Sequence, residues 1–142
     1  MRLCVDKALL DTDILSEIFK AKNATIVANA IAYKEVFGQF TLSVITVMEI
    51  VKGLHKMGRV DALRKFLVGL HGSEVLPFDQ ACAEIAGQVF ADLERIGHPI
   101  GRADPMIAAI AIHNNLTLIS GNVTHYQQIQ ELGYPLKINN WR

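Results

Sequence analysis

The chain has 142 residues, of which 51% are hydrophobic and 20% charged, and its formal net charge at pH 7 is zero. This length suits one domain spanning residues 1–142, and the composition is that of a folded globular domain rather than a disordered chain. A net charge of zero argues against a protein that coats nucleic acid through bulk positive charge, although it does not exclude a nuclease.

Short apolar runs alternate with helical patterns along the chain. In chain order, the expected elements are a strand at Lys7–Asp11, helices at Ile14–Phe19 and Asn23–Val36, a strand at Phe40–Val44, helices at Val47–Met57 and Val60–Leu70, a strand at Glu74–Pro77, helices at Asp79–Ile96 and Pro105–His113, a strand at Leu116–Ile119, a helix at Thr124–Leu132 and an edge strand at Pro135–Ile138. Strands that alternate with helices form βαβ units, so we expect a three-layer α/β/α fold with a mostly parallel central sheet.

The cysteines and the apolar segments indicate the cellular compartment of the protein. Cys4 and Cys82 are the two cysteines and form no CxxC pair, so we expect reduced thiols rather than a disulfide framework or a zinc site. No run reaches the ~18 apolar residues of a membrane-spanning helix, and residues 1–6 lack the apolar core of a signal peptide. We therefore expect a cytoplasmic protein that does not enter a membrane.

Oxygen-bearing side chains stand where several of these elements end or begin. Asp11 and Asp13 close the first strand, and Glu49 lies in an apolar stretch after the second. Asp104 opens a helix, and Asn122 follows the fourth strand. Such ends line one crevice in an open α/β sheet, so we expect these side chains to converge. Converging carboxylates repel one another and favour a hard cation, and oxygen ligands point to Mg²⁺ or Mn²⁺.

Each of these residues also has a purely structural explanation. Either Asp near the first strand can cap the following helix, Thr46-Val-Met-Glu49 matches the capping box T-x-x-E, Asp104-Pro105 is a common helix start, and Asn122 suits a turn or a cap. Capping requires only one acceptor for each helix. It gives no reason for a second Asp two residues after the first, or for Glu49 beyond a Thr that can already cap. Carboxylates around a cation give that reason.

The sequence resembles a known family at four successive motifs. They are Leu9-Leu-Asp-Thr-Asp-Ile-Leu15, Ser43-Val-Ile-Thr-Val-Met-Glu-Ile-Val-Lys-Gly53, Asp104-Pro-Met-Ile-Ala-Ala-Ile-Ala111 and Leu118-Ile-Ser-Gly-Asn-Val-Thr-His-Tyr126. In this order they are similar to the motifs of PIN-domain ribonucleases, above all the VapC-type toxins of bacterial toxin–antitoxin pairs. The ending Ile138-Asn-Asn-Trp141 is also similar to theirs, so the resemblance spans essentially the whole chain.

The resemblance implies a PIN-like fold and a Mg²⁺- or Mn²⁺-dependent endoribonuclease. Asp11, Glu49 and Asp104 would be its catalytic and metal-binding acids. It also implies RNA as the substrate, a homodimer, and a cognate antitoxin that blocks the site. Two positions depart from the family pattern, because many relatives have Asp where this chain has Asn122 and Thr is usual where it has Ser120.

The other polar residues near these motifs are expected to assist. Asp13 would orient the metal ligands or be a weak ligand itself, and Ser120 and Asn122 would place water or substrate. Between residues 52 and 65 the chain carries Lys52, Lys56, Arg59, Arg64 and Lys65 against Asp61 alone. We expect Lys52 and Lys56, with Arg102 beside Asp104, to hold neighbouring phosphates, whereas an ordinary solvated helix face is the alternative explanation of this segment.

Other functions on the same architecture remain open. The pair Asp11 and Asp13 matches the DxD opening of haloacid-dehalogenase-like phosphatases, but their chemistry needs a later Lys and an Asp pair where this chain has Ser120-Gly-Asn122. A phospho-receiver, or a catalytically inactive PIN-like domain, would serve regulation or interaction instead. The five histidines show no HxH or HxxxH spacing, so we expect surface or capping roles for them, and we expect Tyr126 to be a packing residue.

Overall fold

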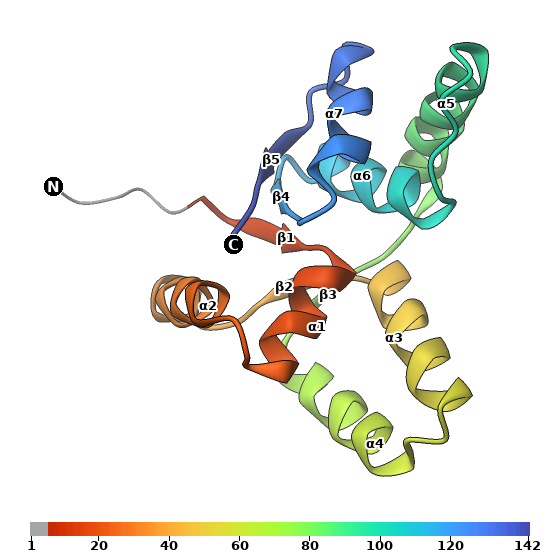
Figure 1. Cartoon of the computed structure of the whole chain (residues 1–142). Coiled ribbons are helices and arrows are strands. Elements are labelled where there is room, and N and C mark those ends of the chain that lie inside the picture. Colours follow the sequence, from red (N-terminus) through yellow and green to blue (C-terminus); the bar gives the residue numbers. More distant parts are fainter. Residues whose placement is uncertain (1–5) are drawn as a thin grey trace, which may run out of the picture.

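A parallel five-stranded sheet forms the centre of the molecule (Figure 1). The computed structural model describes residues 6–142, so the expectations for Cys4 and the first five residues lie outside the described part. The strands are β1 (Ala8–Leu10), β2 (Thr41–Ser43), β3 (Glu74–Leu76), β4 (Thr117–Ile119) and β5 (Lys137–Asn139). Their order is β3-β2-β1-β4-β5, and all neighbouring pairs are parallel.

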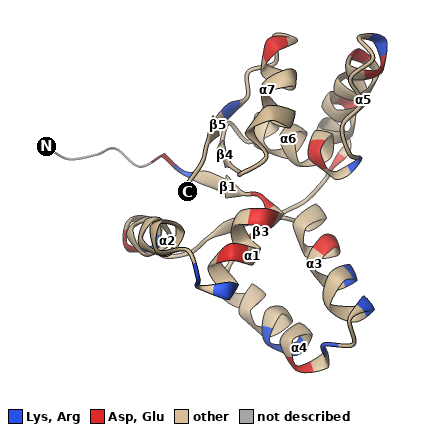
Figure 2. Cartoon of the chain, viewed as in Figure 1, with Lys and Arg blue, Asp and Glu red and all other residues tan. Residues whose placement is uncertain are grey.

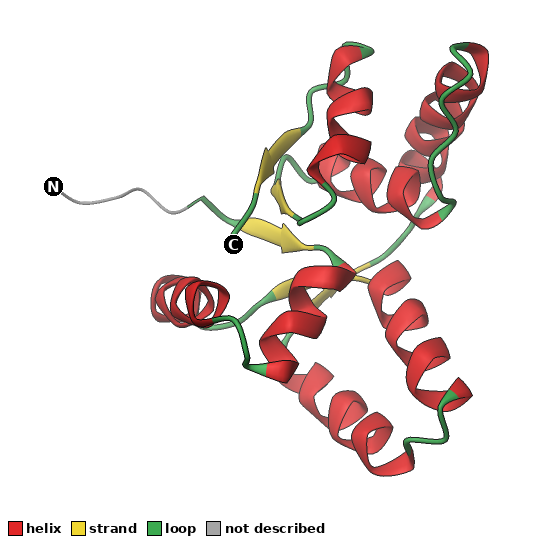
Figure 3. Cartoon of the chain, in the orientation of Figure 1, coloured by secondary structure: helices red, strands yellow, loops and turns green. Residues whose placement is uncertain are grey.

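Helices cover both faces of this sheet (Figure 3). They are α1 (Thr12–Lys20), α2 (Ala24–Phe37), α3 (Val44–Lys56), α4 (Val60–Gly69), α5 (Gln80–Arg95), α6 (Ala103–His113) and α7 (Val123–Glu131), with a 3₁₀ turn η1 (Leu70–Gly72) after α4. The first four helices lie on one side of the sheet and the last three on the other (Figure 1). The predicted three-layer α/β/α fold is therefore confirmed. Among residues 6–142, no helix has the length and apolar character that a membrane crossing requires.

The strands alternate between two hydrophobic cores, as the period-2 geometry of a strand requires. Leu9 and Leu118 point into the core formed with α5, α6 and α7. Their neighbours Leu10 and Ile119 point into the opposite core, with the inner sides of α1 and α2. Helix α6 is buried nearly all round, since every side chain in the stretch Ile107–Ala111 is fully buried. The start of α6 is therefore fixed relative to the sheet.

The chain changes direction in the sheet at β1. From β1 it proceeds outward through β2 to β3, and it later returns to the other side of β1 with β4 and then β5. The Asp11 amide donates to the Ile119 carbonyl at 2.9 Å, so β1 and β4 remain paired to their last residues. The carboxyl ends of β1 and β4 thus form the switch point at which open α/β sheets bind their ligands.

The element boundaries differ from the sequence predictions by one to three residues at several ends. Helix α1 begins at Thr12, so Asp13 lies in its first turn. Helix α3 begins at Val44 rather than near Thr46, because the Ser43 hydroxyl caps it by accepting from the Thr46 amide at 3.1 Å. The last strand starts at Lys137 rather than Pro135, because a turn in which the Leu136 amide donates to the Tyr134 carbonyl precedes it.

Candidate active site

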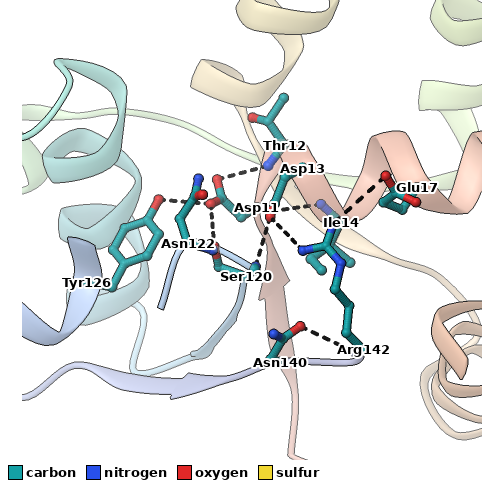
Figure 4. Close-up of polar contacts among 11 residues, drawn as sticks. Asp11, Thr12, Asp13, Ile14, Glu17, Ser120, Asn122, Tyr126, Asn140 and Arg142 are labelled. Carbon is teal, nitrogen blue, oxygen red and sulfur yellow. Dashed lines mark hydrogen bonds and ion pairs between the residues drawn. The ribbon is translucent and has the colours of Figure 1, made fainter. Parts of the chain in front are cut away.

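Asp11 is the central residue of the candidate site. It follows β1 directly, caps α1, and is only 2% exposed. One carboxylate oxygen, Oδ1, accepts from the Thr12 amide at 2.9 Å. The other, Oδ2, accepts from the Ser120 hydroxyl at 2.8 Å and from the Tyr126 hydroxyl at 3.0 Å (Figure 4). The acid is thus held by α1, by the end of β4 and by α7.

Asp104 faces Asp11 across the Tyr126 hydroxyl. It lies in the first turn of α6, and its Oδ1 is 3.3 Å from the Tyr126 oxygen. A phenol has one proton to donate, so Tyr126 bonds fully to only one of the two carboxylates at a time. The Asp104 Oδ2 lies 3.1 Å from the Nδ1 of His125. The fold therefore brings two acids that are far apart in the sequence to a single buried hydroxyl.

The electrostatics of the site disfavour an ionised Asp11. Burial is the largest cause and raises its pKa to about 7, while the Ser120 hydrogen bond opposes the rise and the charges of Asp13 and Asp104 add to it. Burial, and then the charges of Asp11 and Asp104, also raise the pKa of the Tyr126 hydroxyl, which therefore stays a donor. A cation placed between the carboxylates would offset both the cost of burying their charge and the repulsion between them.

Glu49 reaches the site through Thr12 rather than directly. Its Oε1 accepts a hydrogen bond from the Thr12 hydroxyl, which also lies 3.0 Å from the Thr46 hydroxyl. The capping-box explanation of Glu49 is wrong, because Ser43 caps α3 and Glu49 lies more than a turn inside the helix. Asp104 likewise occupies the second position of α6 and not its cap, which is Arg102.

The acids suit a hard cation by the chemistry of their oxygen atoms. Within residues 6–142, no three Asp, Glu, His or Cys side chains are gathered closely enough to hold a metal ion as they stand. Asp11 and Asp104 already share one hydroxyl, and Glu49 would complete an all-oxygen set by releasing Thr12. Carboxylate oxygens are the donors that Mg²⁺ and Mn²⁺ prefer.

Asp13 ties α1 to the loop between β4 and α7. Its Oδ1 accepts from the Ile14 amide and its Oδ2 from the Gly121 amide, both at 2.8 Å. Burial is the largest cause that raises the pKa of Asp13 above its usual value, while its two backbone hydrogen bonds and the Arg142 guanidinium act in the opposite direction. Both oxygens are thus occupied by backbone donors, which agrees with a role in orienting the neighbouring acid.

A comparison with known protein families matches the part of the chain that contains these acids. The family model of the PIN domain matches residues 8–128. The chain belongs to the PIN domain family. The matched range begins with β1 and ends inside α7, so it includes each of the acids above.

Curated relatives of this PIN domain are similar over most of their length. The tRNA(fMet)-specific endonuclease VapC of Shigella flexneri is 30% identical over 128 residues, which cover 87% of this chain and 92% of that protein. The ribonuclease VapC1 of Methanocaldococcus jannaschii is 28% identical, over 89% of this chain and 84% of that protein.

Solved structures of complexes share the fold of this PIN domain. The DNA-bound VapBC of Salmonella typhimurium matches with a TM-score of 0.80 at 27% identity, over 97% of this chain and 100% of that chain. FitAcB of Neisseria gonorrhoeae matches with a TM-score of 0.78 at 27% identity, over 94% of this chain and 97% of that chain. The three-layer fold is therefore the fold of these neighbours.

Ser120 and Asn122 lie in the loop between β4 and α7 of this PIN domain, on either side of Gly121. Ser120 is fully buried; its hydroxyl donates to Asp11 and accepts from the Asn122 amide at 2.9 Å. Asn122 occupies the cap position of α7, but its side chain makes no capping hydrogen bond and is exposed. The capping explanation of Asn122 therefore has no hydrogen bond to support it.

The basic residues lie at the edge of the site. Lys52 and Lys56 are exposed and stand three and seven residues after Glu49, on the same face of α3. Arg102 is exposed immediately before α6. Figure 2 shows Lys and Arg gathered along the end of α3 and on α4, with acidic residues where β1 meets α1. The contact of these cations with phosphate remains a prediction.

Three polar contacts of the site were not predicted from the sequence. Tyr126 packs in the core and His125 lies at the surface, as expected. Both also contact Asp104, and Tyr126 contacts Asp11 as well. They follow Asn122 by three and four residues, and one helical turn returns a side chain toward the helix start, which is the signal that could have found them. Arg142 belongs to no sequence motif, and its ion pair with Asp13 depends on how the fold places the end of the chain beside α1.

Proposed function

We propose that this PIN domain is a divalent-metal-dependent endoribonuclease, the toxin component of a type II toxin–antitoxin system. The observation that carries the proposal is the placement of the Asp11 and Asp104 carboxylates at one buried hydroxyl, at the switch point of the sheet. The names of the relatives, which are ribonucleases and VapC endonucleases, support RNA as the substrate. The phosphatase and phospho-receiver alternatives lose their basis with the family assignment.

Asp11, Asp104 and Glu49 are the residues that would hold Mg²⁺ or Mn²⁺. When bound, either ion supplies a Lewis acid that polarises the phosphodiester and activates a water molecule. Ser120 and Tyr126 fix the rotamer of Asp11, so the acid is aimed before substrate arrives. Lys52, Lys56 and Arg102 would hold the phosphates on either side of the scissile bond.

The partners follow from the same assignment. The neighbours VapBC and FitAcB are complexes, so we propose a cognate antitoxin that covers the acidic site of this chain. A homodimer and a cytoplasmic location belong to the same proposal, as does a single nuclease domain over residues 1–142. The acids, whose charges repel in the free protein, offer an antitoxin cation an obvious place to bind.

Hydrolysis of RNA is expected to require Mg²⁺ or Mn²⁺ and to stop when the ion is chelated. The purified, antitoxin-free protein is incubated with mixed RNA in Mg²⁺, in Mn²⁺ and in excess chelator, and the Asp104→Asn variant, purified in parallel, reports contaminating nuclease. Full activity in the chelator would contradict the metal-dependent mechanism. Absence of cleavage with either ion would instead favour the inactive PIN-like domain.

Asn122→Asp is expected to enlarge the stability gained on adding Mn²⁺. The new carboxylate stands at the end of β4 beside the acids, so it repels them without metal and is neutralised by it. The metal-induced rise in melting temperature should exceed that of the parent by about 2–4 °C, the shift that ~1 kcal/mol produces in a domain of this size. Thermal melts with and without Mn²⁺ measure it.

Gln127→Glu is the matched control, because it adds one negative charge at an exposed position of the same helix. This control should show the metal-induced shift of the parent. Equal shifts in all three proteins would show that Asn122 does not face the cation.

A further inference from the structure

Arg142 lies beside Asp13 and Glu17, two acids of α1 near the candidate site. Its Nη1 is 3.8 Å from Oδ2 of Asp13, and its Nη2 is 3.8 Å from Oε1 of Glu17 (Figure 4). The two acids are four residues apart on α1, so they share one face of that helix and the guanidinium spans both.

The segment after β5 is anchored in a way that directs Arg142 to α1. Trp141 is buried, and its ring centroid lies 5.6 Å from that of Tyr33 in α2. Its carbonyl accepts from the Asn29 side-chain amide at 2.9 Å. The Arg142 amide then donates to Oδ1 of Asn140 at 3.1 Å. The backbone that carries the guanidinium is therefore held by packing and by hydrogen bonds from two sides.

The guanidinium fills the space above Gly121, beside the Asp13 carboxylate. A Cβ built at position 121 would collide with the Arg142 Nη1 and would lie 2.6 Å from the Asp13 Oδ2. Glycine at this position thus lets the guanidinium approach the loop between β4 and α7. The same loop carries Ser120, which bonds to Asp11, so the arginine is next to the acids of the site and not on a distant surface.

A second metal ion would need carboxylates of its own. Two-metal nuclease sites place their ions about 3.5–4 Å apart. Apart from Asp11, Glu49 and Asp104, the acids on this side of α1 are Asp13 and Glu17, and both face Arg142. Asn122, after β4, adds no charge.

We infer that the Arg142 guanidinium serves as the cation for Asp13 and Glu17, and that it thereby limits the site to one divalent ion. The inference rests on the metal site proposed above. Without the guanidinium, the charges of Asp13 and Glu17 would lose the cation that now lies between them, and their carboxylates would be free to attract a second ion.

The test counts Mn²⁺ ions bound per chain, by calorimetric titration at low ionic strength, without RNA. We expect one ion for the parent and two for Arg142→Gln, which keeps a long polar side chain without its charge. Asp13→Asn in the Arg142→Gln background should restore one. Arg95→Gln is the matched control, because Arg95 also pairs with an acid, Asp92 at 3.1 Å, but on the exposed side of α5. It should bind one ion.

The outcomes separate this inference from the proposed function. One ion, bound with parental affinity, in Arg142→Gln would overturn the role of Arg142 and leave the metal site standing. Two ions in the parent would do the same. A parent chain that binds no Mn²⁺ would overturn the metal site, and the inference with it.

Discussion

Asp11→Asn is expected to abolish RNA hydrolysis and at the same time to stabilise the metal-free protein. The change removes one charge from the proposed cation site, where Lewis-acid assistance is worth several kcal/mol, on the order of a thousandfold in rate. It also removes a buried acid whose pKa is raised to about 7. At pH 8 the variant should be more stable by about 2–4 kcal/mol. The amide fits because Tyr126 can direct its proton to Asp104 instead.

Asp79→Asn is the control that separates a metal ligand from a helix cap. Asp79 caps α5 by accepting from the Cys82 amide at 3.0 Å, and Asn caps a helix about as well as Asp. This variant should keep parental turnover and should lose only the stability that the lowered pKa of Asp79 contributes. Initial rates of RNA cleavage and urea unfolding in chelator measure both properties. Parental turnover by Asp11→Asn would show that the residue is only a cap.

The metal-free protein is expected to lose stability as the pH rises from 4 to 8. Asp11 has a pKa of about 7 in the folded protein against its ordinary value of 3.8, so the native state keeps its proton where the unfolded state has lost it. This contribution is complete below pH ~4 and is lost as the pH passes 7, a change of up to roughly 4 kcal/mol. Asp13, whose pKa is raised by burial, acts in the same direction.

Other shifted acids do not produce this trend. The pKa values of Glu74 and Asp79 are lowered, chiefly by the Lys7 side chain and by the Cys82 amide respectively, so they stabilise the protein above their unfolded pKa and lose that effect only in stronger acid. Urea unfolding in chelator at half-unit pH steps tests the prediction, with Asp11→Asn as the control that should show a flatter profile. A parental profile that rises between pH 5 and 8 would contradict it.

The sequence predicted the fold well because strands and helices here differ in period and in their end signals. All five strands and seven helices occur where apolar runs and amphipathic patterns placed them. The errors described above are at the starts of two helices and of the last strand, and single short-range hydrogen bonds decide the starts of α3 and of that strand. Thr46 matched a capping box, but Ser43, the last residue of β2, is the cap of α3, because its hydroxyl accepts from the Thr46 amide.

The sequence allowed the acids of the candidate site to be predicted, but not the side chains that contact them. Asp11 and Asp104 stood out because the carboxyl ends of parallel strands and the starts of the next helices meet at one edge of a sheet. Tyr126 did not stand out, because an aromatic residue on a helix usually packs and its hydroxyl contacts depend on the angle between α6 and α7. Arg142 depended on where the segment after β5 is anchored, which no local pattern encodes.

The pairing of β4 with β1 has a consequence for how the protein is made. The Ser120 bond to Asp11 joins residues 109 positions apart, and Tyr126 reaches Asp11 across 115. Chains emerge from the ribosome N-terminus first, and contacts of such separation form late because a long loop must close before them. A nascent chain that ends before α6 carries Asp11 and Glu49 without Asp104. The contacts that join these acids can therefore form only after α6, β4 and α7 have been synthesised.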